Sequence, residues 1–256
     1  MIMGSRFDAS TSIKSRNVQW CQSKSTVMFF KLTYLYSSMA SWNKAVMKRT
    51  STSESGWRGS PDLWVSAARD VFLASGIENV KIATLSKRLN LSRTSFYWFF
   101  SDREELLAAL MNTWKDKNTG GIVRQSQAYA DSLAEATLNV FDCWLDETLF
   151  DSKFEFAIRS WALQSAEIQQ EVQAADAQRL EALTSMFERF GYDNKAADVH
   201  ARTVYLVQIG YISMQAKEDL AVRMERIPEY IKTFTGTYPK KNEIERFHHR
   251  HGYVPQ

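Results

Sequence analysis

The sequence of 256 residues has few of the residues that build tight turns or covalent cross-links. It contains 10 glycines and 4 prolines, which argues against a β-sandwich or barrel built on many turns. Its two cysteines, Cys21 and Cys143, are too few for a disulfide framework or a zinc site, so a reducing cytoplasm is the expected compartment. No run of about 18 apolar residues occurs, and no membrane helix is predicted.

What the sequence has instead is a high content of Ala, Leu, Glu, Gln, Arg and Met, placed at helical spacing over long stretches. This pattern predicts an all-α protein. The length is sufficient for one large domain or two modest ones, each with its own core. No internal repeat is visible.

Positive charge is concentrated in residues 1–56. This segment has eight Lys/Arg and two acids, a net charge of +6, whereas the whole chain has +3 and the remainder therefore −3. It is rich in Ser and Thr and lacks sustained periodicity, so it is expected to be a disordered basic extension. A basic arm lying against nucleic acid is the alternative. Met28, Met39 and Met47 leave open whether residues 1–46 belong to the native protein.

Residues 57–120 carry signals for four helices. Ser60-Pro61-Asp62 can begin the first helix and Gly76 can end it. A second helix is expected over 82–89, with Asn90 in the turn, and Ser92 can cap a third helix of about seven residues. Ser101-Asp102-Arg103-Glu104 is predicted to be a capping box that begins a longer fourth helix, ending at Asn118-Thr119-Gly120-Gly121.

Longer helical stripes follow in residues 121–236. Residues 154–163 are apolar on most sides and residues 203–214 almost continuously so, which predicts that both helices are covered all round. In the last stripe, Pro228 is expected to break or kink the helix. Residues 237–256 are expected to be a solvated tail.

The expected helix over 82–89, the tight turn at Asn90 and the short helix after Ser92 together have the layout of a helix-turn-helix motif. The first turn of the short helix, with Arg93, Thr94 and Ser95, is expected to face outward. Rings on its other side, at Phe96, Phe99 and Phe100, are expected to anchor a helix that is too short to be stable alone. The five-ring block that follows Ser-Arg-Thr-Ser thus has a structural purpose.

The stretch LSRTSFYWFFSDREELL, residues 91–107, resembles the signature of the tetracycline-repressor (TetR) family of bacterial transcriptional regulators. The resemblance covers residues 57–117. Downstream helices fit the family only in number and length. The resemblance implies a DNA-binding domain of three helices, a fourth helix that connects it to a helical effector-binding domain, and repression that a small molecule relieves.

Four positions depart from the family pattern. Asn90 replaces the usual turn glycine, and Lys81 stands where Thr often begins the second helix. Phe99 and Ser101 replace a common His and a Lys or Arg, which removes two phosphate donors. Phosphate contacts are instead expected from Tyr97, Lys81, Arg103 and the amides that begin the fourth helix.

Base contacts are assigned to the first turn of the short helix. Arg93 is expected to bind guanine edges, Thr94 and Ser95 to make short polar or methyl contacts, and Trp98 to pack on sugar or a thymine methyl. Core packing of Trp98 and a merely solvated Arg93 are the alternatives. The complete set of candidate DNA-binding residues is Lys81, Thr84, Ser92, Arg93, Thr94, Ser95, Tyr97, Trp98 and Arg103.

The expected partners are a double-stranded DNA operator, a second copy of the chain and an unidentified small-molecule effector. Paired half-sites require a dimer, for which residues 195–216 and 219–235 are the candidates. An apolar effector chamber is expected in the middle helices, although core packing is the alternative for each of its residues. The candidate lining residues are Phe141, Trp144, Phe156, Trp161, Gln164, Met186, His200, Tyr205 and Gln208.

Two other classes of function are open. An enzyme lacks support, since no Ser/His/Asp ordering, phosphate loop or paired-carboxylate motif occurs, and no cofactor is expected. Glu245, His248, His249 and His251 form a possible metal cluster, but a solvated tail with adjacent arginines is the preferred interpretation, so no metal site is assigned. A helical adaptor that keeps the helix-turn-helix outline without binding an operator is the second alternative.

Overall fold

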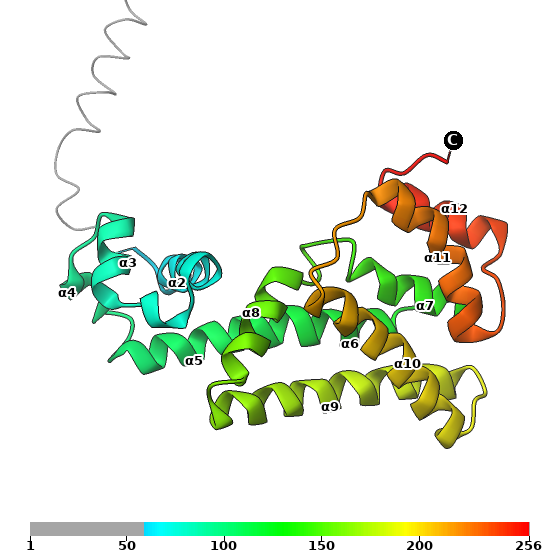
Figure 1. Ribbon diagram of the computed structural model, residues 1–256, viewed down its shortest axis with the longest axis horizontal. Helices are drawn as coiled ribbons and strands as arrows, with labels where there is room; N and C mark the ends of the chain where they lie inside the picture. The colour runs from blue at the N-terminus through cyan, green and yellow to red at the C-terminus, as the bar shows by residue number, and fades with distance from the viewer. Residues whose placement is uncertain (1–58, 256) are drawn as a thin grey trace, which may run out of the picture. The chain divides into compact units, whose positions relative to one another are not determined.

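The computed structural model describes residues 59–255, which are helical throughout and contain no β-strand (Figure 1). The expected basic extension at residues 1–56 lies outside the described residues. The helices are α2 (Pro61–Ser75), α3 (Ile82–Leu89), α4 (Arg93–Phe96), α5 (Arg103–Trp114), α6 (Gly120–Gln127), α7 (Leu133–Asp142), α8 (Ser152–Ala162), α9 (Ala166–Arg189), α10 (Asn194–Ser213), α11 (Leu220–Thr235) and α12 (Lys241–Arg250). A 3₁₀ turn, η1 (Ile77–Asn79), follows α2, and a π-helical turn, η2 (Lys115–Thr119), follows α5.

The first two helices begin and end at the predicted residues. The Ser60 side chain accepts a hydrogen bond from the Leu63 amide, and Gly76 ends α2 with φ of 84°. α3 ends at Asn90, whose φ of 54° lies in the left-handed region that Asn tolerates. The local signals in this segment were therefore sufficient to define its structure.

α4 is shorter than predicted. It spans Arg93–Phe96, and the chain continues through a turn at residues 97–99. The cap of α5 also lies one residue later than the predicted capping box: Asp102 is the N-cap and accepts from the Glu105 amide, while the Ser101 amide donates to the Glu105 carboxylate at 2.6 Å. Asp and Ser are about equally favourable at the N-cap position. Here the Asp102 carboxylate accepts the hydrogen bond from the Glu105 amide, so the helix begins one residue later than predicted.

The predicted helix end at Gly120-Gly121 is wrong. α5, η2 and α6 follow one another without an interruption from Arg103 to Gln127. Gly121 serves close packing instead, since a Cβ there would lie 2.2 Å from the carbonyl oxygen of Leu149. A glycine inside a helix can mark a close backbone contact as well as a stop, and here the local signal could not separate the two.

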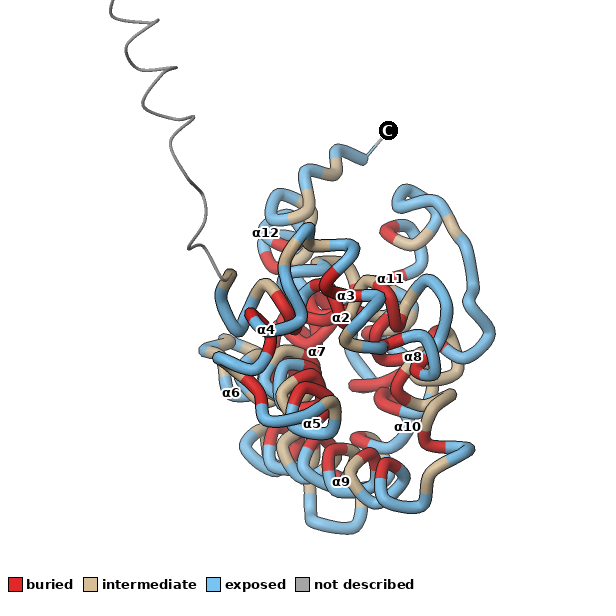
Figure 2. The backbone as a smooth tube through the Cα atoms, turned by 90° about the vertical axis from the view of Figure 1, so that its left-hand side faces the viewer, coloured by how far each residue is buried: buried red, intermediate tan, exposed pale blue. Residues whose placement is uncertain are grey.

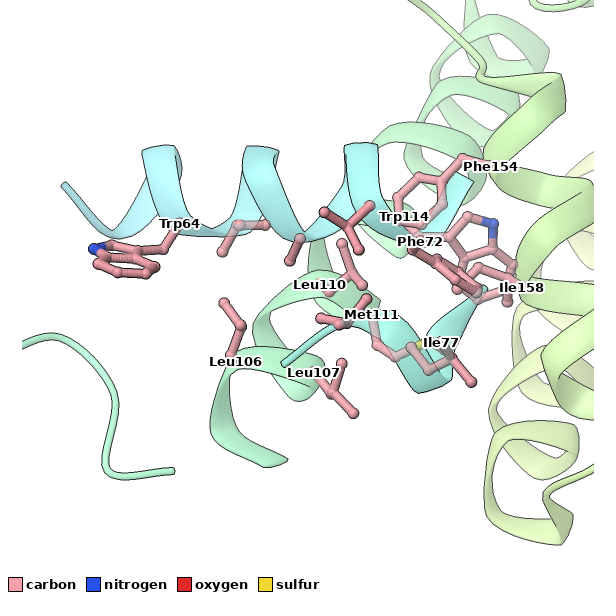
Figure 3. Packing of buried hydrophobic residues seen from close by; sticks show 14 of the residues in the cluster. Trp64, Phe72, Ile77, Leu106, Leu107, Leu110, Met111, Trp114, Phe154 and Ile158 are labelled. Carbon is pink, nitrogen blue, oxygen red and sulfur yellow. The ribbon is translucent and has the colours of Figure 1, made fainter. Parts of the chain in front are cut away.

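Two clusters of buried side chains form the core. The first cluster joins α2 and α5, and α8 contributes side chains to it. Figure 3 shows Trp64, Leu110 and Trp114 between α2 and α5. Phe154 and Ile158 of α8 lie beside them. The second joins α7, α9, α10, α11 and α12. Figure 2 shows the buried residues on the inward sides of these helices.

The chain after residue 236 differs most from expectation. Instead of a solvated tail it forms α12, whose Phe247 is fully buried and whose Arg246 pairs with Glu135 of α7. α11 continues through Pro228 and is not broken there. Charged residues dominate the composition of α12, and Phe247 is the large apolar side chain that it buries. The sequence therefore wrongly predicted a tail in place of an amphipathic helix.

Two helices expected to be covered all round are not. On α10, Val199 and Leu206 are 56% and 59% exposed, and Leu163 at the end of α8 is 89% exposed. α8 also buries the charged Glu155 completely, so its inward face is not purely apolar.

Candidate nucleic-acid interface and effector cavity

α4 is positioned by the turn that precedes it. The Leu91 amide donates to the Ser86 carbonyl at 2.9 Å, which closes the end of α3 around Asn90. Ser92 then caps α4 by accepting from the Ser95 amide at 3.1 Å. The backbone therefore changes direction within three residues and presents the N-terminus of α4.

Aromatic rings hold α4 from the inside, as predicted. Phe96 is fully buried, packs edge-on against Trp64 of α2 with ring centroids 5.3 Å apart, and lies 5.4 Å from Phe100. The neighbouring rings point the other way: Tyr97 is 58% and Trp98 61% exposed. The outward direction of these two rings favours a contact surface over core packing.

The outer surface of α3 and α4 is basic and polar. Ser92, Arg93, Thr94, Lys81 and Thr84 are all exposed. Residues 79–101 contain four basic side chains and no Asp or Glu. A surface with this sign of charge attracts a phosphate backbone.

Two candidates have positions that the sequence did not indicate. Ser95, expected to face outward, is buried, and its hydroxyl lies 2.9 Å from that of Ser92. Arg103 is partly buried, with its guanidinium donating to the carbonyls of Val80 at 2.7 Å and Ile77 at 2.9 Å. Arg103 thereby fixes η1 against α5.

Lys87 and Arg88 of α3 belong to the same exposed basic surface and were not among the candidates. Arg88 pairs with Asp70 of α2 at 2.9 Å. The absence of acids from residues 79–101 was the signal that could have identified both.

A cavity of about 770 Å³ opens between α8, the end of α10 and the end of α2. Five of the nine candidate effector residues line it, namely Trp144, Phe156, Trp161, Gln164 and Gln208. The sequence missed its other walls, which are formed by α2 and η1 (Phe72, Leu73, Ile77) and by Tyr211, Lys217 and Arg223. These walls come from segments distant in the sequence, and periodicity alone cannot bring them together.

The other four candidates lie in the core instead of the cavity wall. Phe141 packs edge-on against Trp144, and Met186 is 1% exposed. His200 stacks on Phe187, and its Nδ1 lies 2.7 Å from the Phe234 carbonyl oxygen. The fourth, Tyr205, belongs to a buried network of charged groups.

That network centres on Glu155 and Arg179, both fully buried. Arg179 Nη1 lies 2.7 Å from Glu155 Oε1 and 2.9 Å from the Tyr205 hydroxyl. Glu155 also accepts from Trp114 Nε1 at 2.7 Å and from the Asn118 amide at 2.9 Å. These bonds connect α8 and α9 to the junction of α5 and η2.

Electrostatics in this network keeps its groups charged. Burial by itself would raise the pKa of Glu155, but the positive charges of Arg179 and Arg159 and the hydrogen bonds outweigh it, so that the pKa lies below its ordinary value. Burial raises the pKa of the Tyr205 hydroxyl. Both arginines remain protonated, and the assembly is a compensated ionic cluster.

The histidines near the C-terminus do not form a metal site. His251 Nε2 lies 2.8 Å from Asp142 Oδ1, whereas His249 is exposed. Within residues 59–255, no three His, Cys, Asp or Glu side chains gather as metal ligands would. In the same part of the chain, none of the helices has the length and apolar character needed to cross a bilayer.

The arrangement of α2, α3 and α4 is that of a helix-turn-helix DNA-binding domain, and α5 joins it to a larger helical module. Residues 65–110 match the model of the "Bacterial regulatory proteins, tetR family". The part of the chain that contains α2, α3, α4 and the start of α5 is therefore similar to the DNA-binding domain of this family of transcriptional regulators.

Solved structures share this fold at low sequence identity. A transcriptional regulator (TerR/AcrR family) from Aquifex aeolicus VF5 superposes with a TM-score of 0.55 at 15% identity, over 68% of this chain and 99% of the other. The fatty acid degradation regulator FadR from Bacillus halodurans has a TM-score of 0.50 at 15% identity, over 70% of this chain and all of its own. None of the curated proteins matches the sequence.

Proposed function

We propose that this chain is a cytoplasmic transcriptional repressor that binds a palindromic operator as a homodimer and leaves it when a small molecule occupies the cavity. One observation carries the proposal: α4 is held from the inside by Phe96 and presents Arg93 and Thr94 to solvent on a segment free of acidic residues. An α-helix presented in this way fits the major groove, where arginine binds guanine with two hydrogen bonds.

Phosphate contacts are assigned to the exposed groups around α4. Lys81, Tyr97 and the polar Ser92 and Thr84 border the same surface. Arg103 is expected to contribute less to phosphate binding than Lys81, because its guanidinium already donates to carbonyl groups of the protein. We assign a phosphate contact to the exposed Lys87 instead of Arg103.

The homodimer interface is assigned to α10. Val199, Leu206 and Met214 of this helix are exposed, and a Cβ placed on Gly210 would meet no atom within 4 Å. An apolar helix face with a glycine at its centre suits close packing against its symmetry copy. After its apolar first turn, the exposed positions of α11, such as Glu225, Glu229 and Lys232, are mostly charged and suit the rim.

Release by the effector is assigned to the cavity because its walls include Phe72, Leu73 and Ile77 of the DNA-binding domain. A ligand there touches both modules at once. It acts only through its different affinity for the operator-bound and released arrangements of the dimer.

The experiment is a gel-shift titration of purified protein with an operator selected from a random DNA pool. Arg93→Ala is expected to weaken operator binding about 10- to 100-fold and to leave binding to unrelated DNA within about twofold. Lys241→Ala removes the same charge from α12, which lies at the other end of the described chain (Figure 1), and is expected to change neither.

An unchanged ratio of operator to unrelated-DNA affinity in Arg93→Ala would contradict the assignment of α4. Wild-type protein that selects no sequence and shows no dependence on salt would instead indicate the adaptor function, since phosphate neutralisation imposes a steep salt dependence.

A further inference from the structure

The proposed effector cavity contains two polar side chains, Arg223 and Gln208, whose hydrogen-bonding capacity the protein does not use in full. We propose that its ligand is an amphipathic organic acid, an apolar body with one anionic head group that pairs with Arg223 and accepts a hydrogen bond from the Gln208 amide. The proposal rests on the cavity being the effector site, as proposed above, and adds the chemical class of the effector.

Arg223 is a cation without a counter-ion. It lies on α11, is partly buried and lines the cavity. Its Nη1 donates to the Trp144 carbonyl at 3.3 Å, and among residues 59–255 no carboxylate forms an ion pair with it: Glu218 acts on it only at longer range and is itself paired with Arg226. Burial lowers the pKa of Arg223. A guanidinium removed from water and left without an anion is costly, so an anionic ligand gains the interaction that the fold leaves open.

The other buried arginines show how this chain usually compensates such a charge. Arg179 and Arg159 each contact Glu155, and Arg159 also contacts Asp176. Both arginines are fixed within the protein and have no capacity left for a ligand. Arg223, by contrast, is only partly buried and lines the cavity.

Gln208 provides the second observation. Its side chain on α10 is only 4% exposed, yet the structure gives it no hydrogen-bond partner among the described residues. A primary amide has two donors and one acceptor, and the protein uses none of those of Gln208. Because Gln208 lines the cavity, a ligand oxygen is the natural partner.

The remaining walls define the rest of the ligand. Phe156 and Trp161 give the cavity an aromatic surface, and about 770 Å³ accommodates a molecule of drug size. Lys153 and Lys217 also line it, against the single carboxylate of Glu78. The excess of positive charge favours an anion over a neutral or cationic ligand.

The test compares two fluorescent probes with closely related ring systems. 1-Anilinonaphthalene-8-sulfonate carries an anionic group, and N-phenyl-1-naphthylamine lacks it. The wild-type protein is expected to bind the sulfonate more tightly. Arg223→Met is expected to weaken the sulfonate about 10- to 100-fold and the neutral probe by less than about twofold, since one charge-assisted contact is lost.

Three further variants control the comparison. Arg226→Met removes an exposed arginine of the same helix that pairs with Glu218, and it is expected to bind both probes as the wild type does. Arg223→Lys keeps the charge and is expected to retain most of the sulfonate affinity. Ala157→Trp fills the cavity from α8 and is expected to abolish binding of both probes.

Several results would overturn the proposal. They are equal affinity for the two probes, no effect of Arg223→Met, an equal loss in Arg223→Lys, and binding that survives Ala157→Trp and therefore lies outside the cavity. For the arginine variants, retained binding of the neutral probe and an unchanged circular dichroism spectrum show that the protein is folded; for Ala157→Trp the unchanged spectrum alone shows it. If the sulfonate binds through Arg223 but leaves operator affinity unchanged, ligand release is refuted while the ligand class stands.

Discussion

Removing Arg179 tests whether the buried ionic cluster holds the two helical modules together. Arg179→Met keeps the length and apolar stem of the side chain but deletes a guanidinium that contacts Glu155, Thr119 and Tyr205 at distances of 2.7, 2.9 and 2.9 Å. Glu155 is then left fully buried with less positive charge beside it. Breaking a buried pair in this way costs about 3–5 kcal/mol of the free energy of unfolding.

Arg159 sets the expected value within that range. Its Nε remains 2.9 Å from Glu155 Oε1, so the carboxylate keeps one cationic partner and the cost is expected near the lower bound, about 3 kcal/mol. For about 200 described residues this corresponds to a fall in melting temperature of roughly 6–12 °C. Urea denaturation of the full-length protein, followed by circular dichroism, measures the loss.

The loss is expected to depend on pH with a definite sign. The pKa of Glu155 is lowered in the folded protein, so its stabilising contribution is complete above the pKa of an unfolded glutamate, about 4.3, and disappears as pH falls through the folded value. Without Arg179, burial raises the pKa of Glu155, and acid protonates it readily. The difference in unfolding free energy between wild type and variant is therefore largest at pH 7 and narrows toward pH 4.

Arg202→Met is the matched control. Arg202 pairs with Asp198 on the surface of α10, where both side chains are about half exposed, and the expected change is below about 0.5 kcal/mol. A change in Arg179→Met as small as this, or a difference from wild type that grows in acid, would refute the account of the cluster as a compensated buried charge.

Two further substitutions test the dimer face and the close contact at α6. Leu206→Glu places a charge on the exposed face of α10 and is expected to convert dimers to monomers at micromolar concentration in light scattering. Leu163→Glu, at a still more exposed leucine that ends α8, is not expected to do so; dimers that persist in Leu206→Glu would refute the interface. Gly121→Ala forces a Cβ against the Leu149 carbonyl and is expected to cost about 1–3 kcal/mol in thermal unfolding; an Ala variant as stable as the wild type would show that the backbone yields there.

The DNA-binding domain was predictable from the sequence because its signals are local. Ser60 and Gly76 bound α2, Asn90 fixes the turn, and Ser92 caps α4, each acting on neighbours within a few residues. Capping, left-handed turns and short-range periodicity act at this range. The errors at α4 and at the cap of α5 were of one to three residues, whereas the helix end predicted at Gly120-Gly121 was wrong by about a further two turns.

The second module was less predictable because its contacts are distant in the sequence. Glu243 of α12 accepts from the Ser132 hydroxyl at 2.9 Å, although the two residues are 111 positions apart. Contacts of this kind hold α12 on the second module, and no local signal in residues 237–256 indicates them. Gly121 packs on Leu149 across a turn of the chain, and the cavity combines η1 with α10. Helical spacing identifies an inward side but cannot name the partner that it faces.

α8 is the element through which the proposed ligand would affect the DNA-binding domain. It presents Phe156 to the cavity and Glu155 to the ionic cluster, and its N-cap Asp151 accepts from Arg69 of α2 at 3.0 Å. A movement of α8 toward a bound ligand must therefore either stretch charged contacts to α2 and η2 or move those elements with it. Because breaking buried charge pairs costs several kcal/mol, joint movement is the cheaper response, and in the proposed mechanism it would change the position of α4 in each half of the proposed dimer.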